Sequence, residues 1–399
     1  MSAPSLPQRP AKAQRVQGFG TTVFTVWSQL ARKLEAINLG QGFPDFEPPA
    51  FVLEAGRRAM EGYQQYSPLA GMPRLREAVA HTMREEMGRE IDVEREITVT
   101  VGATEGIYTS ITALVNPGDE VVLLEPFYDS YPASITMAGG IPRYVPLRLG
   151  EEGDWTLDLE ELRSVLNDKT RMLIVNTPNN PTGKRFTREE LQGIADLCHE
   201  FDLYVLADEV YDRLVFDGQK HIPIASLPGM WERTITLRSV GKTFSVTGWK
   251  IGWAVASPAL SEAIRMAHQW IPFSTSSPFQ NAMADVLLES EENGYYDDFI
   301  AMYQSKRDKL VTALRSAGLK PVVPEGTYFV MANTADFGFA TDDAFCQHLA
   351  ETAGVVAIPP GSFYSPEHRH LAYPLARFAF CKRDEVLDEA AERLQNLRG

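Results

Sequence analysis

Short apolar segments alternate with stretches of helical spacing through the central part of the chain. The apolar segments lie at 97–101, 121–124, 172–175, 204–206 and 234–237. One helical stretch begins at Thr187, where Glu190 completes a capping box before an apolar series of Leu191, Ile194, Ala195 and Cys198. This alternation is typical of βαβ units, which build a mostly parallel sheet covered by helices on both faces.

The pattern changes after about residue 280. A charged helical stretch at 303–314 leads to strand-like runs at 320–323, 328–332, 355–358 and 377–381, with helices between them. We therefore expect an α/β fold whose mostly parallel sheet is flanked by helices, with a smaller α+β domain formed by the C-terminal part and the N-terminal segment. The expected divisions are a flexible tail at 1–18, an N-terminal segment joining the small domain at 19–50, a large domain at 51–290 and a small C-terminal domain at 291–399.

Length and composition narrow the class of protein. A chain of 399 residues usually forms more than one domain, and 44% hydrophobic with 23% charged residues is ordinary for a globular protein. No apolar run approaches the roughly 18 residues of a membrane span, and no secretory signal is visible, so we expect a cytoplasmic protein without membrane contact. A net charge of −15 argues against nucleic acid as a partner.

Cysteine and histidine usage predicts neither disulfides nor a metal site. The three cysteines are odd in number and lie far apart without a CxxC pair. His368 and His370 stand two residues apart, but no carboxylate accompanies them at the spacing of a metal site. We expect reduced thiols and no bound metal.

The stretch at 98–106 combines a strand with the start of a helix. The strand breaks at Gly102, and the helical spacing that follows would leave the backbone N–H groups of Ala103 and Thr104 unpaired at a helix N-terminus. Such an end can bind a phosphate monoester, although an ordinary strand-to-helix turn also uses glycine. Neither a dinucleotide GxGxxG fingerprint nor a P-loop is present.

Two further strands end in polar residues. Asn180 lies in a turn stiffened by two prolines and Gly183, and Asp208 ends a run that we expect to be buried on both faces. A buried carboxylate costs several kcal/mol unless a cation or several donors meet it, and the neighbouring sequence offers no obvious cation. A cationic ligand atom would resolve this, whereas helix capping by Asp208 is the alternative.

Lys242 follows another apolar strand among small and apolar residues. Burial there, with Lys250 as a neighbouring cation, would lower its amine pKa and make it nucleophilic toward an aldehyde. Lys250 and the Ser239 hydroxyl also suit a phosphate dianion. Taken alone, Lys242 could equally be an exposed, solubilising lysine.

Together these motifs resemble the pyridoxal-phosphate enzymes of aminotransferase fold type I, class I/II, in the branch with kynurenine, methionine and N-succinyldiaminopimelate aminotransferases. The resemblance covers nearly the whole chain, from the motifs at 21–24 and 38–46 through 125–131 to 356–359 and 377–382. It implies pyridoxal 5'-phosphate in the large domain and a homodimer with shared active sites.

The resemblance assigns roles to single residues. Lys242 would form the Schiff base with the cofactor, and Asp208 would pair with the pyridine nitrogen, while Asn180 and Tyr211 would donate to the phenolic oxygen. Of these, Lys242, Asp208 and Tyr211 would be the catalytic residues. The remaining implied contacts are Ala103, Thr104, Ser239 and Lys250 with the phosphate, Tyr66 with the phosphate of a second subunit, Phe127 with the ring face, and Arg377 with the backbone at Gly40 for the substrate carboxylate. Asn180 would also contact the substrate.

One position departs from the wider class. Most members have arginine where Lys250 stands, and lysine there is a feature of the kynurenine branch. A point-charge contact would then replace a bidentate one.

The implied reaction moves an amino group from an L-amino acid to a 2-oxo acid. The aromatic residues Phe127, Tyr131, Phe273, Phe363 and Tyr364 border the motifs, so a donor that is aromatic, kynurenine, glutamine or methionine-like would fit, although each could be ordinary core packing. An N-succinyldiaminopimelate aminotransferase and a cysteine-conjugate β-lyase remain alternatives on the same fold. A regulatory protein would need a DNA-binding module for which we expect no room, and a catalytically inactive scaffold would be expected to lack Lys242, Asp208 or Arg377.

Overall fold

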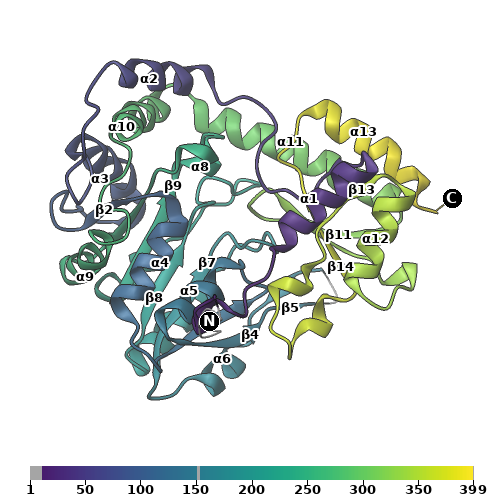
Figure 1. Cartoon of the computed structure of the whole chain (residues 1–399), viewed down its shortest axis with the longest axis horizontal. Helices are drawn as coiled ribbons and strands as arrows, with labels where there is room; N and C mark the ends of the chain where they lie inside the picture. Colours follow the sequence, from purple (N-terminus) through teal and green to yellow (C-terminus); the bar gives the residue numbers. More distant parts are fainter. Residues whose placement is uncertain (1–10, 151–152, 399) are drawn as a thin grey trace, which may run out of the picture.

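A seven-stranded sheet forms the centre of the protein (Figure 1). The computed structural model describes residues 11–150 and 153–398. Within these residues the strand order is β2-β10-β9-β8-β7-β3-β4, and β10 alone runs antiparallel to its neighbours. The mostly parallel sheet expected from the sequence is confirmed. The strands are β2 (Ile97–Thr100), β3 (Glu120–Glu125), β4 (Ile141–Pro146), β7 (Thr170–Asn176), β8 (Tyr204–Asp208), β9 (Thr234–Ser239) and β10 (Gly252–Ala256).

Helices cover both faces of this sheet because its strands are apolar on both faces. Along β3, Val121 and Leu123 pack into one layer while Val122 and Leu124 pack into the other. Each fully buried side chain of this kind contributes about 1.5–3 kcal/mol. One layer contains α4 (Gly102–Leu114), α5 (Ser130–Ala138) and α9 (Pro258–His268), and the other contains α6 (Leu159–Val165) and α7 (Arg188–Glu200).

The predicted capping box is confirmed at the start of α7. The Thr187 side chain accepts from the backbone of Glu190, whose own side chain accepts from the backbone of Thr187. Beside the β2 edge, a third group of helices packs against the sheet: α2 (Ala50–Met60), α3 (Pro73–Met87) and α10 (Ser277–Glu292).

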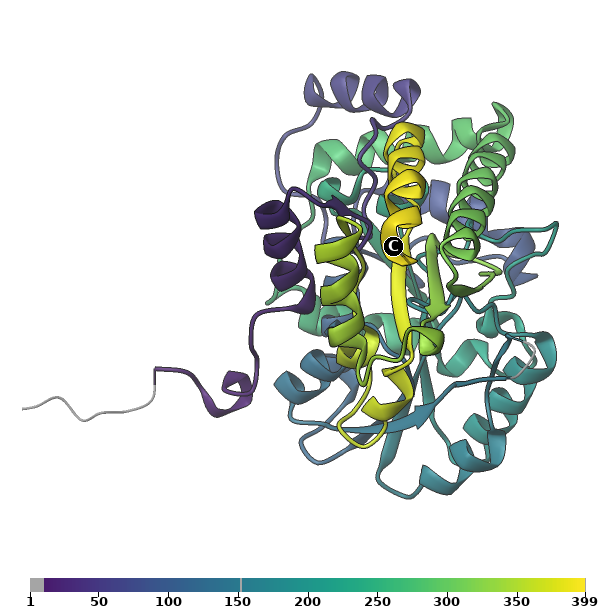
Figure 2. The same cartoon turned by 90° about the vertical axis from the view of Figure 1, so that its right-hand side faces the viewer.

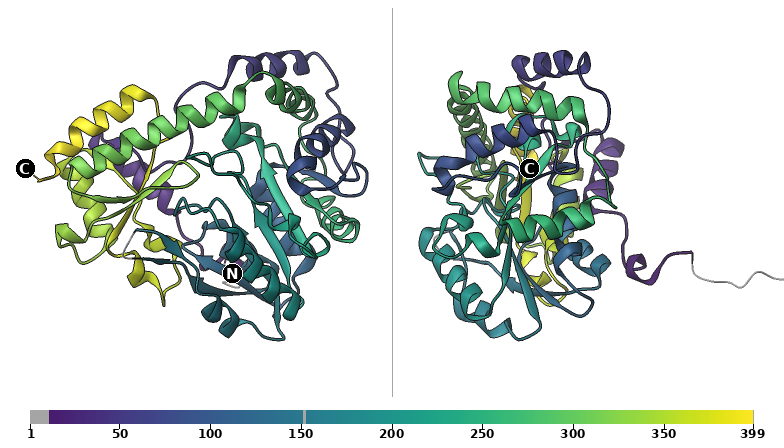
Figure 3. Two further views of the ribbon diagram at one scale, coloured as in Figure 1. Left: turned by 180° about the vertical axis from the view of Figure 1, so that it is seen from behind. Right: turned by 90° about the vertical axis from the view of Figure 1, so that its left-hand side faces the viewer.

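The C-terminal part forms a second, smaller sheet. Its strands β11 (Lys320–Val322), β12 (Phe329–Asn333) and β14 (Leu375–Ala379) are antiparallel, and α11 (Tyr295–Ser316) runs from α10 to this part of the molecule (Figure 3). The helix expected at 303–314 is thus the second half of a longer one. The other helices here are α12 (Asp342–Thr352) and α13 (Asp384–Leu394).

The N-terminal segment joins this C-terminal part. Strand β1 (Ile37–Asn38) pairs with β13 (Val355–Val356), and α1 (Val23–Leu34) lies beside the C-terminal elements (Figure 2). The pairing supports our proposal that residues 19–50 belong to the small domain. The strand expected at 355–358 is shorter, although Ile358 still pairs with Arg377 through two backbone hydrogen bonds.

Short elements complete the described chain. They are β5 (Arg148–Leu149), β6 (Trp155–Thr156), α8 (Val240–Thr243) and 3-10 helices at Gln14–Val16, Ile224–Ser226, Trp231–Arg233, Thr247–Trp249, Ala335–Phe337, Pro360–Phe363, Arg369–Ala372 and Gln395–Arg398.

Residues 1–10 of the expected flexible tail lie outside the described residues. Among the helices at 11–150 and 153–398, none has both the length and the apolarity needed to cross a membrane. In the same residues, no group of three or more histidine, cysteine, aspartate or glutamate side chains is arranged to hold a metal ion.

Candidate active site

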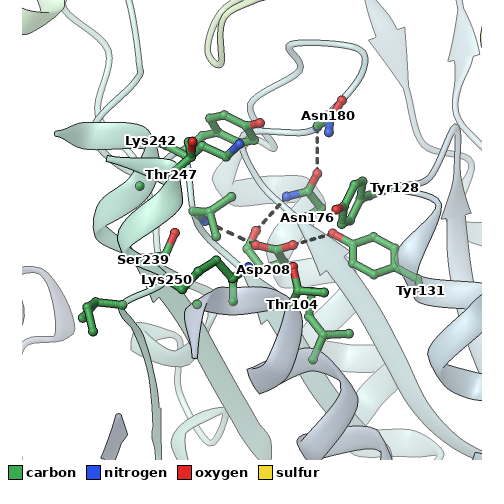
Figure 4. Close-up of a pocket in the computed structure, with 17 residues that line it drawn as sticks. Thr104, Tyr128, Tyr131, Asn176, Asn180, Asp208, Ser239, Lys242, Thr247 and Lys250 are labelled. Carbon is green, nitrogen blue, oxygen red and sulfur yellow. Dashed lines mark hydrogen bonds between the residues drawn. The ribbon is translucent and has the colours of Figure 1, made fainter. Parts of the chain in front are cut away.

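A cavity of about 210 Å³ lies at the carboxyl ends of the parallel strands (Figure 4). Open α/β sheets place ligands at this edge, because the loops that follow the strands converge there. The cavity brings together, from distant segments, eight of the ten residues that the resemblance assigned to the cofactor: Ala103, Thr104, Asn180, Asp208, Tyr211, Ser239, Lys242 and Lys250.

Asp208 projects into the cavity from the end of β8. Its carboxylate accepts a 2.7 Å hydrogen bond from the Tyr131 hydroxyl and a 3.4 Å bond from the N–H of Val210. Burial raises the pKa of Asp208 to about 6, while the bond from Tyr131 opposes this rise. A turn rather than a helix follows β8, so Asp208 is not a helix cap. A cationic ligand would stabilise this carboxylate further.

Lys242 enters the cavity from α8. Its Nζ lies 3.5 Å from the carbonyl oxygen of Gly42 and 5.8 and 5.6 Å from the ring centroids of Tyr211 and Tyr328. Burial lowers the pKa of Lys242 to about 8. A larger fraction of neutral, nucleophilic amine is therefore present near neutral pH than for an ordinary lysine.

The lower end of the cavity has the chemistry of an anion site. Helix α4 begins there without a capping side chain in the described structure, and the Ser239 hydroxyl and the Lys250 amine lie beside it (Figure 4). Gly102 has a φ of +68°, and a β-carbon there would lie 3.2 Å from Nζ of Lys250. A β-carbon on Gly252 would lie 3.0 Å from the backbone nitrogen of Ala103. The two glycines therefore keep space around donors that suit a phosphate.

Arg377 adjoins the cavity from β14. Its guanidinium donates to Oδ1 of Asn180 at 3.1 Å and to the carbonyl oxygen of Gly40 at 2.8 Å. Its Nε has no hydrogen-bond partner among the described residues, and burial lowers the pKa of Arg377 to about 10. A buried cation with an unpartnered donor is well placed to bind a carboxylate.

Comparison with known proteins identifies this arrangement. The family model for aminotransferase class I and II matches residues 35–394. The chain belongs to the class I and II aminotransferases. It is an enzyme of amino-group transfer, in a family known to use pyridoxal phosphate.

Relatives and solved structures agree along almost the full length of this aminotransferase. A kynurenine–oxoglutarate transaminase of Dictyostelium discoideum is 41% identical and covers 98% of this chain and 97% of its own. The structure of N-succinyldiaminopimelate aminotransferase from Mycobacterium tuberculosis is 41% identical, with a TM-score of 0.92 over 97% of this chain and all of the other. An Escherichia coli protein with methionine aminotransferase function is 37% identical, with a TM-score of 0.90 over 96% and 99%.

Phe127 does not lie in the cavity, contrary to the sequence prediction. Its ring is buried against Tyr144, with centroids 5.6 Å apart, in the core between the sheet and α4 and α5. The backbone N–H of Phe127 donates to the carbonyl oxygen of Phe363, which holds the loop so that the next side chain, Tyr128, faces the cavity. The resemblance assigned the ring contact to the first of two adjacent aromatic residues, whereas the second, Tyr128, lines the cavity.

The other aromatic candidates lie in different parts of the aminotransferase. Tyr131 lines the cavity, whereas Phe363 and Tyr364 are buried outside it. Tyr66 and Phe273 lie on the surface, 74% and 56% exposed, with their rings in edge contact at 5.2 Å. Neither of these two residues reaches the cavity of its own chain.

Two supports of the site were missed in the sequence. Asn176 donates to the carbonyl oxygen of Asp208 at 2.9 Å and accepts from the N–H of Asn180 at 2.7 Å, so it ties the Asn180 turn to the end of β8. Behind the sheet edge, the fully buried Glu209 accepts from Arg238 at 2.8 Å, which joins the ends of β8 and β9. The sequence did carry a signal for both: Asn176 begins the turn that contains Asn180, and Glu209 directly follows Asp208.

Proposed function

We propose that this aminotransferase holds pyridoxal phosphate through the amine of Lys242 and moves an amino group from an L-amino acid with a large apolar or aromatic side chain to a 2-oxo acid. The observation that carries the proposal is the convergence, in one cavity, of a buried lysine of lowered pKa, a buried carboxylate and an uncapped helix N-terminus. These three features match the aldehyde, the ring nitrogen and the phosphate of the cofactor.

The donor set of the cavity fits the cofactor. Asp208 would pair with the ring nitrogen, Asn180 and Tyr211 would donate to the phenolic oxygen, and Tyr128 rather than Phe127 would contact the ring. The phosphate contacts would be Ala103, Thr104, Ser239 and Lys250. When bound, pyridoxal phosphate supplies an aldehyde that condenses with amines and a ring that accepts electrons.

The protein's own groups position the substrate and move its protons. Arg377 would bind the substrate carboxylate together with the backbone at Gly40, which fixes the direction of the bond from Cα to hydrogen. The Nζ of Lys242 would accept the proton from Cα, and its lowered pKa suits this exchange near neutral pH. Asp208 would keep the ring nitrogen protonated.

The lining of the cavity supports an apolar or aromatic amino donor. Ile107 and Val210, which have no proposed cofactor contact, also line it, and their aliphatic groups favour such a side chain. Relatives named for kynurenine and for methionine are consistent with this choice. The relative named for N-succinyldiaminopimelate makes that substrate the second candidate.

We propose that the enzyme is a cytoplasmic homodimer with shared active sites. Tyr66 and Phe273, exposed and in ring contact, form an apolar surface that a second copy of the chain would cover, and Trp270 nearby in the sequence is 84% exposed. Tyr66 would then reach the phosphate of the partner subunit. The three cysteines are free and buried, as in reducing compartments.

Trapping the bound cofactor tests the central proposal. The protein purified with pyridoxal phosphate should be reduced by borohydride and digested, and the modified peptide should be identified by mass spectrometry. We expect the label on Lys242. A label on another lysine, or no yellow chromophore before reduction, would disprove the assignment.

A panel of amino donors tests the substrate class. Kynurenine, phenylalanine, methionine, glutamine and N-succinyldiaminopimelate should each be assayed with 2-oxoglutarate, pyruvate and 2-oxobutyrate. We expect the largest kcat/KM for an apolar or aromatic donor. A clear preference for N-succinyldiaminopimelate, or release of pyruvate and ammonia from a cysteine conjugate without consumption of the acceptor, would overturn the proposed substrate class or reaction.

A further inference from the structure

Glu125, at the end of β3, is a buried carboxylate bonded to a distant part of the chain. It is 0% exposed. One carboxylate oxygen accepts from the backbone N–H of Ser365, and the other lies within hydrogen-bonding distance of Nδ1 of His368. The two partners follow it by 240 and 243 residues and belong to the C-terminal part of the molecule.

A third bond joins the same two segments. The N–H of Phe127 donates to the carbonyl oxygen of Phe363 at 2.9 Å. Residues 125–127 are thus tied at three points to residues 363–368. Hydrogen bonds fix relative position more strictly than apolar contact does, because they depend on both distance and direction.

The segment at 363–368 contacts Arg377 through the side chain of Phe363. The ring centroid of Phe363 lies 5.1 Å from the guanidinium carbon of Arg377, and Ile358, just before the segment, pairs with the Arg377 backbone at 3.0 and 2.9 Å. On the other side, residues 125–127 precede Tyr128 and Tyr131, which line the cavity. The three bonds therefore connect the proposed carboxylate-binding side of the site with its cofactor-binding side.

Removing Glu125 from water is unfavourable by itself. Burial raises the pKa of Glu125, and the bonds from Ser365 and His368 oppose this change. A buried polar cluster of this kind adds little net stability, and its best attested use is to select one arrangement of the elements that it joins. This is the property that a substrate clamp built from two parts of a chain requires.

We propose that Glu125 and His368 form a clasp that positions Arg377 for the substrate carboxylate, a role that rests on the proposed function of Arg377. Neither residue lines the cavity. They are positioning residues for amino-acid and oxo-acid binding. Loss of the clasp should weaken carboxylate binding more than it slows proton transfer at Lys242.

Kinetics of the holoenzyme variants Glu125→Ala, Glu125→Gln and His368→Ala test the clasp. KM and kcat for the amino donor would be measured, together with inhibition by isocaproate, a carboxylate that has neither an amino nor an oxo group. We expect Glu125→Ala to raise KM and the inhibition constant roughly tenfold, with a smaller change in kcat, because displacing a substrate clamp is costly. The absorbance of the bound cofactor should stay unchanged.

Glu125→Gln is the rescue variant. Its amide oxygen can still accept from Ser365, and its NH₂ group can donate to Nδ1 of the other histidine tautomer, so KM should stay close to that of the wild type. The double variant Glu125→Ala/His368→Ala should have the same KM as Glu125→Ala alone, because the two substitutions remove the same interaction. His368 is partly exposed, so His368→Ala tests the clasp even if Glu125→Ala fails to fold.

The same strand provides a matched control. Glu120, at the other end of β3, is 3% exposed and bonds Arg143 and Asn167, far from the cavity along the strand. Glu120→Ala should lower stability without changing KM or isocaproate binding. His370 is an exposed neighbour of His368, and His370→Ala should likewise leave KM and isocaproate binding unchanged. Equal KM values for the Glu125→Ala and Glu120→Ala enzymes would overturn the clasp.

Failure of the clasp and failure of the proposed function give different results. If the wild-type enzyme transfers amino groups and is labelled at Lys242, but the variants have unaltered KM values, only the clasp is disproved. If the wild-type protein is not labelled and does not transfer amino groups, the proposed function is disproved. A raised inhibition constant in both Glu125→Ala and His368→Ala, corrected in Glu125→Gln, supports the clasp.

Discussion

At the scale of single residues, Lys242 gives the most direct prediction. Lys242→Ala should still bind pyridoxal phosphate without a covalent link, while kcat falls by about 10³-fold or more because the proton-transferring amine is lost. The measurement is steady-state transamination with the cofactor in excess. Lys184→Ala is the control: Lys184 is also buried, but it bonds Trp155 and Glu190 away from the cavity, so its loss should lower Tm and leave kcat unchanged. Wild-type turnover in Lys242→Ala would refute the mechanism.

Tyr131 predicts a pH effect at Asp208. The pKa of the Asp208 carboxyl is raised to about 6 by burial, and the hydrogen bond from Tyr131 holds it below the value that burial alone would produce. Tyr131→Phe removes the bond, so the pKa should rise by roughly one pH unit. Because the ionised carboxylate is the form that pairs with a protonated ring, cofactor affinity should then begin to fall at a higher pH as the solution is acidified.

The pH prediction is checked by measuring the dissociation constant of pyridoxal phosphate between pH 5 and 8. Tyr364→Phe serves as the control, because the Tyr364 hydroxyl is buried, lies outside the cavity and has no hydrogen-bond partner among the described residues. Its profile should match that of the wild type. Coincident profiles for Tyr131→Phe and the wild type would show that the bond does not tune Asp208.

At the scale of elements, the start of α4 depends on Gly102. Its φ of +68° disfavours any side chain, and a β-carbon would crowd Nζ of Lys250. Gly102→Ala should lower the free energy of unfolding by roughly 1 kcal/mol or more and weaken pyridoxal-phosphate binding about tenfold, because it disturbs the proposed phosphate donors. Chemical denaturation and cofactor titration measure the two effects.

Gly88, at the end of α3, separates backbone strain from the effect on the site. It has a similar φ of +64°, but a β-carbon there would meet no atom within 4 Å. Gly88→Ala should lose stability and keep its cofactor affinity. If both variants bind pyridoxal phosphate equally well, the start of α4 does not form the phosphate site.

At the scale of the whole molecule, the shared active site can be tested by mixing subunits. Tyr66→Ala and Lys242→Ala variants, each weak or inactive alone, should be co-expressed. If Tyr66 serves the partner, each mixed dimer contains one site with both residues intact, so the preparation should recover about a quarter of wild-type activity. If Tyr66 serves its own subunit, or the enzyme is a monomer, co-expression restores nothing.

The sequence by itself determined the parallel sheet, the α7 capping box and most of the cavity. These features depend on local causes: apolar strands buried on both faces, a Thr–Glu pair at a helix start, and polar residues placed directly after strands, where the topology of a parallel sheet gathers them. Lys242, Asp208 and Asn180 were found in this way without coordinates.

The tertiary structure decided the side-chain directions and long-range bonds that the order of residues along the chain does not determine. Phe127 and Tyr128 are neighbours of similar chemistry, and a backbone bond to Phe363 selects which ring faces the cavity. The bond from Tyr131 to Asp208 and the contacts of Glu125 join residues 77 to 243 positions apart, and no periodic pattern encodes such pairs. Local patterns specify elements and the ends at which they meet, whereas side-chain direction and long-range bonds depend on how the packed elements fit together.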